Sequence, residues 1–174
     1  MKKILLYLFT ALLCTAVLTG CKGTESCPAA PDSTPFLTEP ANWEGDAPQE
    51  VIDLIENAGH RVSRVSTAPS ILHGQRCHME LDGDKLHAVA VYQYESAANA
   101  AAEADCIGAD GYSFAFPLNQ NEVNIVEVSW VDAPHFYLSG SRIILYIGQD
   151  KALTAAFENA FGAPFAGVEV SGAA

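Results

Sequence analysis

Two stretches of the chain carry apolar residues at the three- and four-residue spacing of amphipathic helices, and a third is rich in alanine, which has a high intrinsic helix propensity. Each stretch follows a residue that favours helix N-caps, namely Asp46, Ser96 and Asp150. In the last stretch the apolar stripe consists of Leu153, Ala156, Phe157, Ala160 and Phe161. The pattern predicts three helices, which cover approximately residues 47–58, 97–106 and 151–161.

Alternating apolar and polar residues predict strands between these helices. Asp82-Gly83-Asp84 is a hairpin-type turn signal between residues 78–81 and 86–94. A second hairpin is expected around Ser139-Gly140-Ser141, and its second strand, residues 142–147, is apolar on both faces as a central strand requires. Further strands are predicted at residues 61–67 and 123–131.

The order of these elements predicts an α+β fold. A hairpin followed by a helix occurs twice after the first helix, so we expect a small antiparallel sheet with helices on one face, built from two ββα units. Residues 47–168 hold enough apolar residues for a single domain of this kind. The other expected segments are a signal peptide at residues 1–20, a flexible tether at residues 21–46 and a frayed tail at residues 169–174.

The N-terminus has the pattern of an export signal. Lys2 and Lys3 precede an apolar run that reaches Val17, and Leu18-Thr19-Gly20-Cys21 follows. This segment resembles the lipobox of bacterial lipoproteins, which implies lipidation of Cys21 and cleavage before it. The resemblance implies a location in the bacterial cell envelope, on the periplasmic face of the outer membrane in a Gram-negative host and otherwise on the outer face of the cell membrane. The alternative is an ordinary secretory peptide with an incidental cysteine.

The expected mature chain is strongly acidic. The full sequence has 9 Lys and Arg against 21 Asp and Glu, and removal of Lys2 and Lys3 with the signal leaves 7 basic residues and a net charge of −14. Such a surface repels nucleic acids and anionic lipid head groups, because both are bound through clusters of lysine and arginine. Solubility alone accounts for the acidity, and cationic partners are allowed.

A second resemblance concerns the C-terminal part of the chain. The run PHFYLSGSRIILYIG at residues 134–148 and the run FGAPFAG at residues 161–167 are similar to the C-terminal half of a set of small, uncharacterised bacterial lipoproteins and secreted proteins. The resemblance supports the expected fold and implies no activity.

Three cysteines remain after the expected cleavage and lipidation. Disulfides persist in the compartments outside the bacterial cytoplasm, so we expect a Cys77–Cys106 bridge that closes a loop of about thirty residues. Cys27 then stays free or cross-links a partner. The alternative is that Cys77 and Cys106 are two buried thiols.

Histidines provide the candidates for metal binding and catalysis. His73, Cys77, His78 and His87 lack the paired spacing of zinc sites, so no metal is expected, and a weak site across the first hairpin at His78 and His87 is the alternative. For a hydrolase, the local candidates are Asp132, His135 and either Ser139 or Ser141, without a nucleophile-elbow motif. The carboxylates, Glu103 among them, are scattered and include no evident acid–base pair.

These observations favour a non-enzymatic binding module that is anchored to the membrane and that contacts a protein or a small ligand. No cofactor and no nucleic acid are expected. Aromatic residues commonly supply the contacts in such modules, and the candidates are Tyr92, Tyr94, Trp130, Phe136 and Tyr137. The alternative function is a small envelope hydrolase or a metal-binding protein that uses His135 or the His78 and His87 pair.

Overall fold

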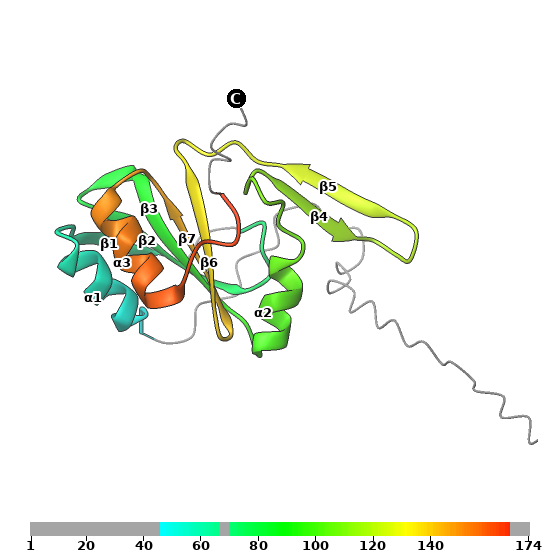
Figure 1. Ribbon diagram of the computed structural model, residues 1–174, viewed down its shortest axis with the longest axis horizontal. Helices are drawn as coiled ribbons and strands as arrows, with labels where there is room; N and C mark the ends of the chain where they lie inside the picture. Colours follow the sequence, from blue (N-terminus) through cyan, green and yellow to red (C-terminus); the bar gives the residue numbers. More distant parts are fainter. Residues whose placement is uncertain (1–45, 67–69, 168–174) are drawn as a thin grey trace, which may run out of the picture.

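A five-stranded antiparallel sheet forms the centre of the molecule in the computed structural model, which describes residues 46–66 and 70–167. The strand order is β1-β2-β3-β7-β6. Two further strands, β4 and β5, form a separate ribbon that extends away from this sheet (Figure 1). The strands are β1 (Val62–Ser66), β2 (Gln75–Leu81), β3 (Asp84–Gln93), β4 (Ser113–Pro117), β5 (Val123–Glu127), β6 (Pro134–Ser139) and β7 (Arg142–Ile147).

The helices are divided between the two faces of the sheet. They are α1 (Gln49–Asn57), α2 (Ala97–Ala104) and α3 (Lys151–Phe161). Helices α1 and α3 lie on one side, whereas α2 lies on the other (Figure 1). The α+β class is therefore confirmed, but the prediction of helices on one face only is wrong. The physical reason lies in the inner strands β3 and β7, which are apolar on both faces and need a cover on each.

Each face of the sheet has its own hydrophobic core. On the first face Val91 and Ile144 pack with Val51 of α1 and Phe157 of α3. On the second face, side chains of β3, β6 and β7 pack with α2 and with the inner side of the β4–β5 ribbon. The buried residues of this second core include Tyr92, Ala104, Phe114, Phe116, Phe136 and Leu145.

The two predicted hairpin-helix units are present. The first consists of β2, β3 and α2, and the second of β6, β7 and α3. They meet where β3 pairs with β7, with Val91 opposite Ile144. Since α2 and α3 cover opposite faces, the two units are not equivalent in the assembled sheet.

Side-chain caps start two of the three helices as predicted. The Ser96 hydroxyl accepts a hydrogen bond from Asn99 N at 3.1 Å, and the Asp150 carboxylate accepts from Ala152 N and Leu153 N at 2.8 and 2.9 Å. The predicted cap at Asp46 is wrong, because the N-cap position of α1 is Pro48, which makes no side-chain cap bond.

The predicted Cys77–Cys106 disulfide is also wrong. Cys77 is a free, buried thiol in the core of the α1 and α3 face, and Cys106 is buried in the core of the opposite face. The sheet itself therefore separates the two sulfur atoms. Cys106 is disulfide-bonded, and no disulfide joins two cysteines of the described part of the chain. The predicted signal peptide, Cys21, Cys27, most of the tether and the tail at residues 169–174 lie outside the described residues.

Candidate functional site

The five aromatic candidates differ in their access to solvent. Tyr92, Phe136 and Tyr137 are buried to 2% exposure or less and pack in the two cores, so their rings are not available to a partner. Trp130 is partly buried, and its indole N–H donates to the Gly111 carbonyl at 2.8 Å. Tyr94 borders a cavity.

The histidines of the first hairpin do not form a pair. His78 lies opposite Ala90 in the β2–β3 ladder, three residues away from His87. Burial lowers the pKa of His78, and the positive charge of Arg76 adds to this effect. Within residues 46–66 and 70–167, no three histidine, cysteine or acidic side chains gather as metal ligands. The geometry therefore does not support the expected alternative of a metal site across this hairpin.

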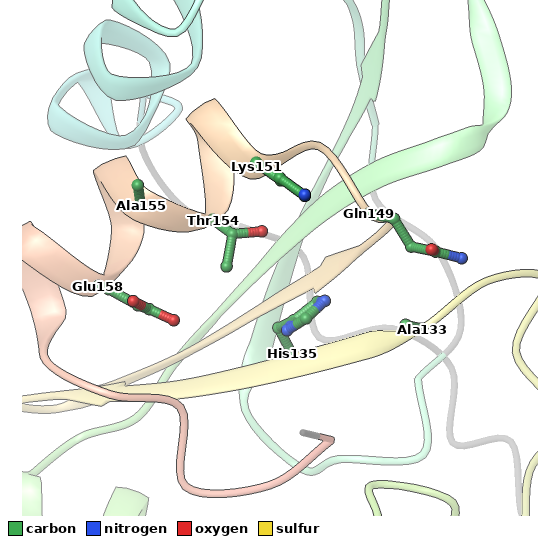
Figure 2. Close-up of a pocket in the computed structure, with 7 residues that line it drawn as sticks. All are labelled: Ala133, His135, Gln149, Lys151, Thr154, Ala155 and Glu158. Carbon is green, nitrogen blue, oxygen red and sulfur yellow. The ribbon is translucent and has the colours of Figure 1, made fainter. Parts of the chain in front are cut away.

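His135 lies in a cavity of about 380 Å³ between β6 and α3 (Figure 2). Its Nε2 is 3.0 Å from the Gly148 carbonyl oxygen, and its ring is stacked on Tyr146 with 5.7 Å between centroids. Lys151 and Glu158 extend from α3 on the side of His135 (Figure 2). The bond to a backbone carbonyl gives His135 a structural role at the start of β6.

The residues expected to complete a hydrolase around His135 are not brought together. Ser139 and Ser141 flank the turn at the far end of β6, where Ser139 pairs with Arg142, whereas His135 pairs with Tyr146. The Ser141 hydroxyl accepts a hydrogen bond from Gln93. Asp132 accepts from Gln149 at 2.6 Å, which lowers the pKa of its carboxyl group. No serine of this set lies within reach of His135 as a nucleophile would.

A larger cavity, of about 540 Å³, lies beside α2. We call it the α2 cavity. Its lining residues are His73, Gly74, Gln75, Gln93, Tyr94, Glu95, Asn99 and Glu103. They come from the segment before β2, from β2 and β3, from the segment between β3 and α2, and from α2. Among the described residues that line it there is no lysine or arginine, so carboxylates and neutral polar groups determine its electrostatic character.

Glu103 and His73 form a buried pair in the α2 cavity. Glu103 is 1% exposed. Its Oε1 accepts a hydrogen bond from the backbone N–H of His73 at 3.1 Å, and the same oxygen lies 2.9 Å from His73 Nδ1. The hydrogen bond to Glu103 raises the pKa of His73, against the opposing effect of burial. The His73 ring is 32% exposed and meets Phe116 edge-on at 5.4 Å. The buried carboxylate thus fixes the orientation of a partly exposed imidazole in the cavity lining.

Tyr94 forms part of the wall beside this pair. A Cβ at position 74 would meet the Tyr94 ring at 2.8 Å, so the close approach requires Gly74. Burial and the negative charge of Glu103 raise the pKa of the Tyr94 hydroxyl.

In the sequence, Glu103 is one of a set of scattered acids that includes no evident acid–base pair. Its spacing nevertheless indicates burial. Glu103 lies three residues after Ala100 and next to Ala104, which form the buried side of α2. An acid on the buried side of an alanine-rich helix requires a partner, which the fold provides in His73.

The outer face of the β4–β5 ribbon is a third feature, and we call it the ribbon face. Phe114 and Phe116 point into the second core, so the alternate residues of both strands face outward. Val123 is 55% exposed and Ile125 is 66% exposed, and Leu118 at the turn is 50% exposed. Ala115 lies opposite Ile125 and Pro117 opposite Val123, which extends the apolar surface onto β4.

Comparison with protein-family models, with curated proteins and with solved structures finds no match to this chain. Within residues 46–66 and 70–167, none of the helices has the length and apolar character needed to cross a membrane.

Proposed function

We propose that this chain is a lipid-anchored protein of the bacterial cell envelope that works as a non-enzymatic binding module for another protein. The lipobox-like sequence that ends at Cys21 supports the anchor. The exposed aliphatic surface of the ribbon face is the observation that carries the proposed binding function.

The ribbon face differs from an ordinary scatter of exposed apolar residues. Val123 and Ile125 are adjacent outward positions of one strand, and both are more than half exposed. A two-stranded ribbon is marginally stable by itself, and here only its inner side is packed. Contiguous apolar surface of this kind commonly marks a protein contact.

Strand addition suits this surface. Strand β5 pairs only with β4 among the described strands, which leaves its outer edge for a third strand. An extended segment of a partner would extend the ribbon through backbone hydrogen bonds. Its aliphatic side chains would cover Val123 and Ile125.

The charges beside the ribbon face favour a basic partner. Exposed Glu122 precedes β5, and Glu127 lies on the same outward side as Ile125 at the other end of the strand. The full chain has a net charge of −12, so a second copy would bring like charges together. We therefore expect a partner segment in which lysine or arginine flanks aliphatic residues.

Site-specific photo-crosslinking in the native envelope tests this function. A photoreactive amino acid replaces Ile125 in the full chain, and the matched control carries it at Leu86 of β3, which is 57% exposed. We expect a reproducible protein adduct at position 125 and none at position 86. The adduct yield should fall at high salt and in Glu127→Lys, since both weaken the attraction of basic residues. Equal capture at both positions, or a crosslinked peptide without basic residues, would overturn the proposal.

The proposed anchor has a separate test. Cells labelled with a palmitate analogue should incorporate it into the full chain, and Cys21→Ser should abolish incorporation and prevent recovery with membranes. Labelling that persists in Cys21→Ser would contradict lipidation at this cysteine without bearing on the ribbon face.

A further inference from the structure

The α2 cavity has the size of a small-molecule site, and this inference is independent of the proposed protein contact. Its volume of about 540 Å³ lies within the usual range for ligand pockets. Apart from Gly74 and the Tyr94 ring, its lining residues carry amide, imidazole or carboxylate groups. Such a lining selects a ligand by hydrogen bonds and charge.

One hydrogen-bonding group of this lining is the His73 imidazole, which is 32% exposed. Its Nδ1 is engaged by Glu103, with distances of 2.9 Å to Oε1 and 3.1 Å to Oε2. When the imidazole is neutral, Nδ1–H donates to the carboxylate, and Nε2 is an acceptor. Glu103 is too deeply buried for extensive ligand contact, so it acts as a positioning residue for His73.

The charges around His73 favour a cation over an anion. Glu103 on α2 contributes a carboxylate behind the ring, and Glu95 contributes a second, exposed carboxylate at the rim. Arg76 of β2 is not one of the lining residues, and its guanidinium lies 5.9 Å from the Tyr92 ring centroid and 3.1 Å from His78 Nδ1. An anion would meet two carboxylates, whereas a cation would be attracted by both.

We propose that the α2 cavity binds a small organic amine in its protonated form, with the ammonium group donating a hydrogen bond to His73 Nε2. Asn99 and Gln75 supply amide groups for the polar remainder of the ligand. The exposed Glu95 attracts the cation toward the cavity mouth.

Isothermal titration calorimetry of the full chain with putrescine tests the proposal. The matched control ligand is 1,4-butanediol, which has the same length and no charge. At pH 8 and low ionic strength we expect saturable binding of putrescine at one site and none of the diol. Equal heats for the two compounds, or no saturation with putrescine, would overturn the assignment of an amine site.

Charge-removing variants locate the site. Glu103→Gln should reduce putrescine affinity at least about tenfold, because the carboxylate that holds His73 and attracts the cation is lost. Glu95→Gln, at an exposed rim position that does not endanger folding, should reduce it about threefold. The control Glu56→Gln removes the same charge from an exposed position of α1, on the opposite face of the sheet from α2, and should leave the affinity unchanged. An equal loss in Glu56→Gln would mean non-specific attraction to an acidic chain and would contradict the proposed site.

Discussion

Tyr137 and Tyr146 both pack edge-on against Phe157, with centroid distances of 5.7 and 6.0 Å, but their hydroxyl groups differ. The Tyr146 hydroxyl accepts a hydrogen bond from Asp150 N at 3.0 Å. The Tyr137 hydroxyl is buried and has no hydrogen-bond partner among the described residues. Burial raises the pKa of Tyr137. The same core thus contains one satisfied and one unsatisfied phenol.

Removal of each hydroxyl should therefore have opposite effects on stability. We expect Tyr137→Phe to raise the free energy of unfolding by about 1 kcal/mol, because an unsatisfied polar atom leaves the core. Tyr146→Phe should lower it by about 1 kcal/mol, because Asp150 N loses its acceptor. Urea unfolding of both variants checks this. A loss of stability in Tyr137→Phe equal to that in Tyr146→Phe would contradict the difference.

His60 connects the end of α1 to the β2–β3 turn, and it should make stability depend on pH. Its Nδ1 lies 2.7 Å from Asp82 Oδ2, and its Nε2 lies 3.7 Å from Asp150. The hydrogen bond with Asp82 raises the pKa of His60, and the same bond lowers the pKa of Asp82. The stabilisation that His60 contributes to the folded state is complete below pH 6.5, the pKa of histidine in the unfolded chain. It is lost as pH rises through the higher pKa of the folded state. The stabilisation that Asp82 contributes is present above pH 3.8, the pKa of aspartate in the unfolded chain. It is lost as pH falls through the lower pKa of the folded state.

We therefore expect the stability difference between the wild type and His60→Gln to be largest between about pH 4 and pH 6 and to shrink at higher pH. Unfolding by urea across this range measures the difference. The control is His87→Gln, where the histidine is exposed and 3.8 Å from Asp84. A difference that grows above pH 7 would have the wrong sign and would exclude this ion pair as its cause.

Substitution of Gly148 and Gly140 by alanine allows the cost of backbone strain to be compared with the cost of steric overlap in the core. Both have positive φ, of 152° and 56°, but only at Gly148 would a Cβ overlap the buried Tyr146 ring. We expect Gly140→Ala to cost about 1 kcal/mol from backbone strain alone, and Gly148→Ala to cost about 3 kcal/mol or more. Thermal unfolding compares them. Equal costs would mean that Tyr146 moves freely, contrary to its 2% exposure.

The two described cysteines should respond differently to alkylation. Cys77 is 1% exposed and burial raises the pKa of its thiol, so iodoacetamide should leave it unmodified in the native protein and modify it after unfolding. Cys106 should become reactive only after unfolding and reduction, because it is disulfide-bonded. Peptide mapping by mass spectrometry measures both. A crosslinked peptide that contains Cys77 and Cys106 would contradict their placement on opposite faces.

Local signals in the sequence predicted the two central hairpins. Gly83 and Gly140 occupy turn positions with φ of 79° and 56°, where other residues are strained, and β7 is buried on both faces as predicted. The short edge strand β1 was likewise predicted. These features depend on neighbouring residues alone, and so sequence patterns reveal them.

The sequence of α2 does not indicate which face of the sheet the helix packs against. Alanine occupies most of the positions in AANAAAEA, so no apolar stripe indicates a direction. Strand β4 was not predicted, although Phe114 and Phe116 alternate with outward residues, because the run is short and ends in Pro117.

The candidate site was only partly accessible to sequence reasoning. His73 was recognised as a candidate metal ligand, but its partner Glu103 lies thirty residues away on a helix. Their contact depends on how α2 packs, which no local pattern encodes. The ribbon face was missed for a related reason, since residues 123–131 were predicted as a strand without a partner.

The pairing of β3 with β7 has a consequence for the moment at which the chain can fold. Val91 meets Ile144, more than fifty residues later, and neither hydrophobic core is complete until β7 and α3 are available. Sheets with such long-range pairing form slowly, because the entropy of loop closure must be lost first. A growing chain therefore stays unfolded until nearly all of it has been synthesised. That delay suits a protein that must pass through a translocation channel as an extended polypeptide, as the proposed export requires.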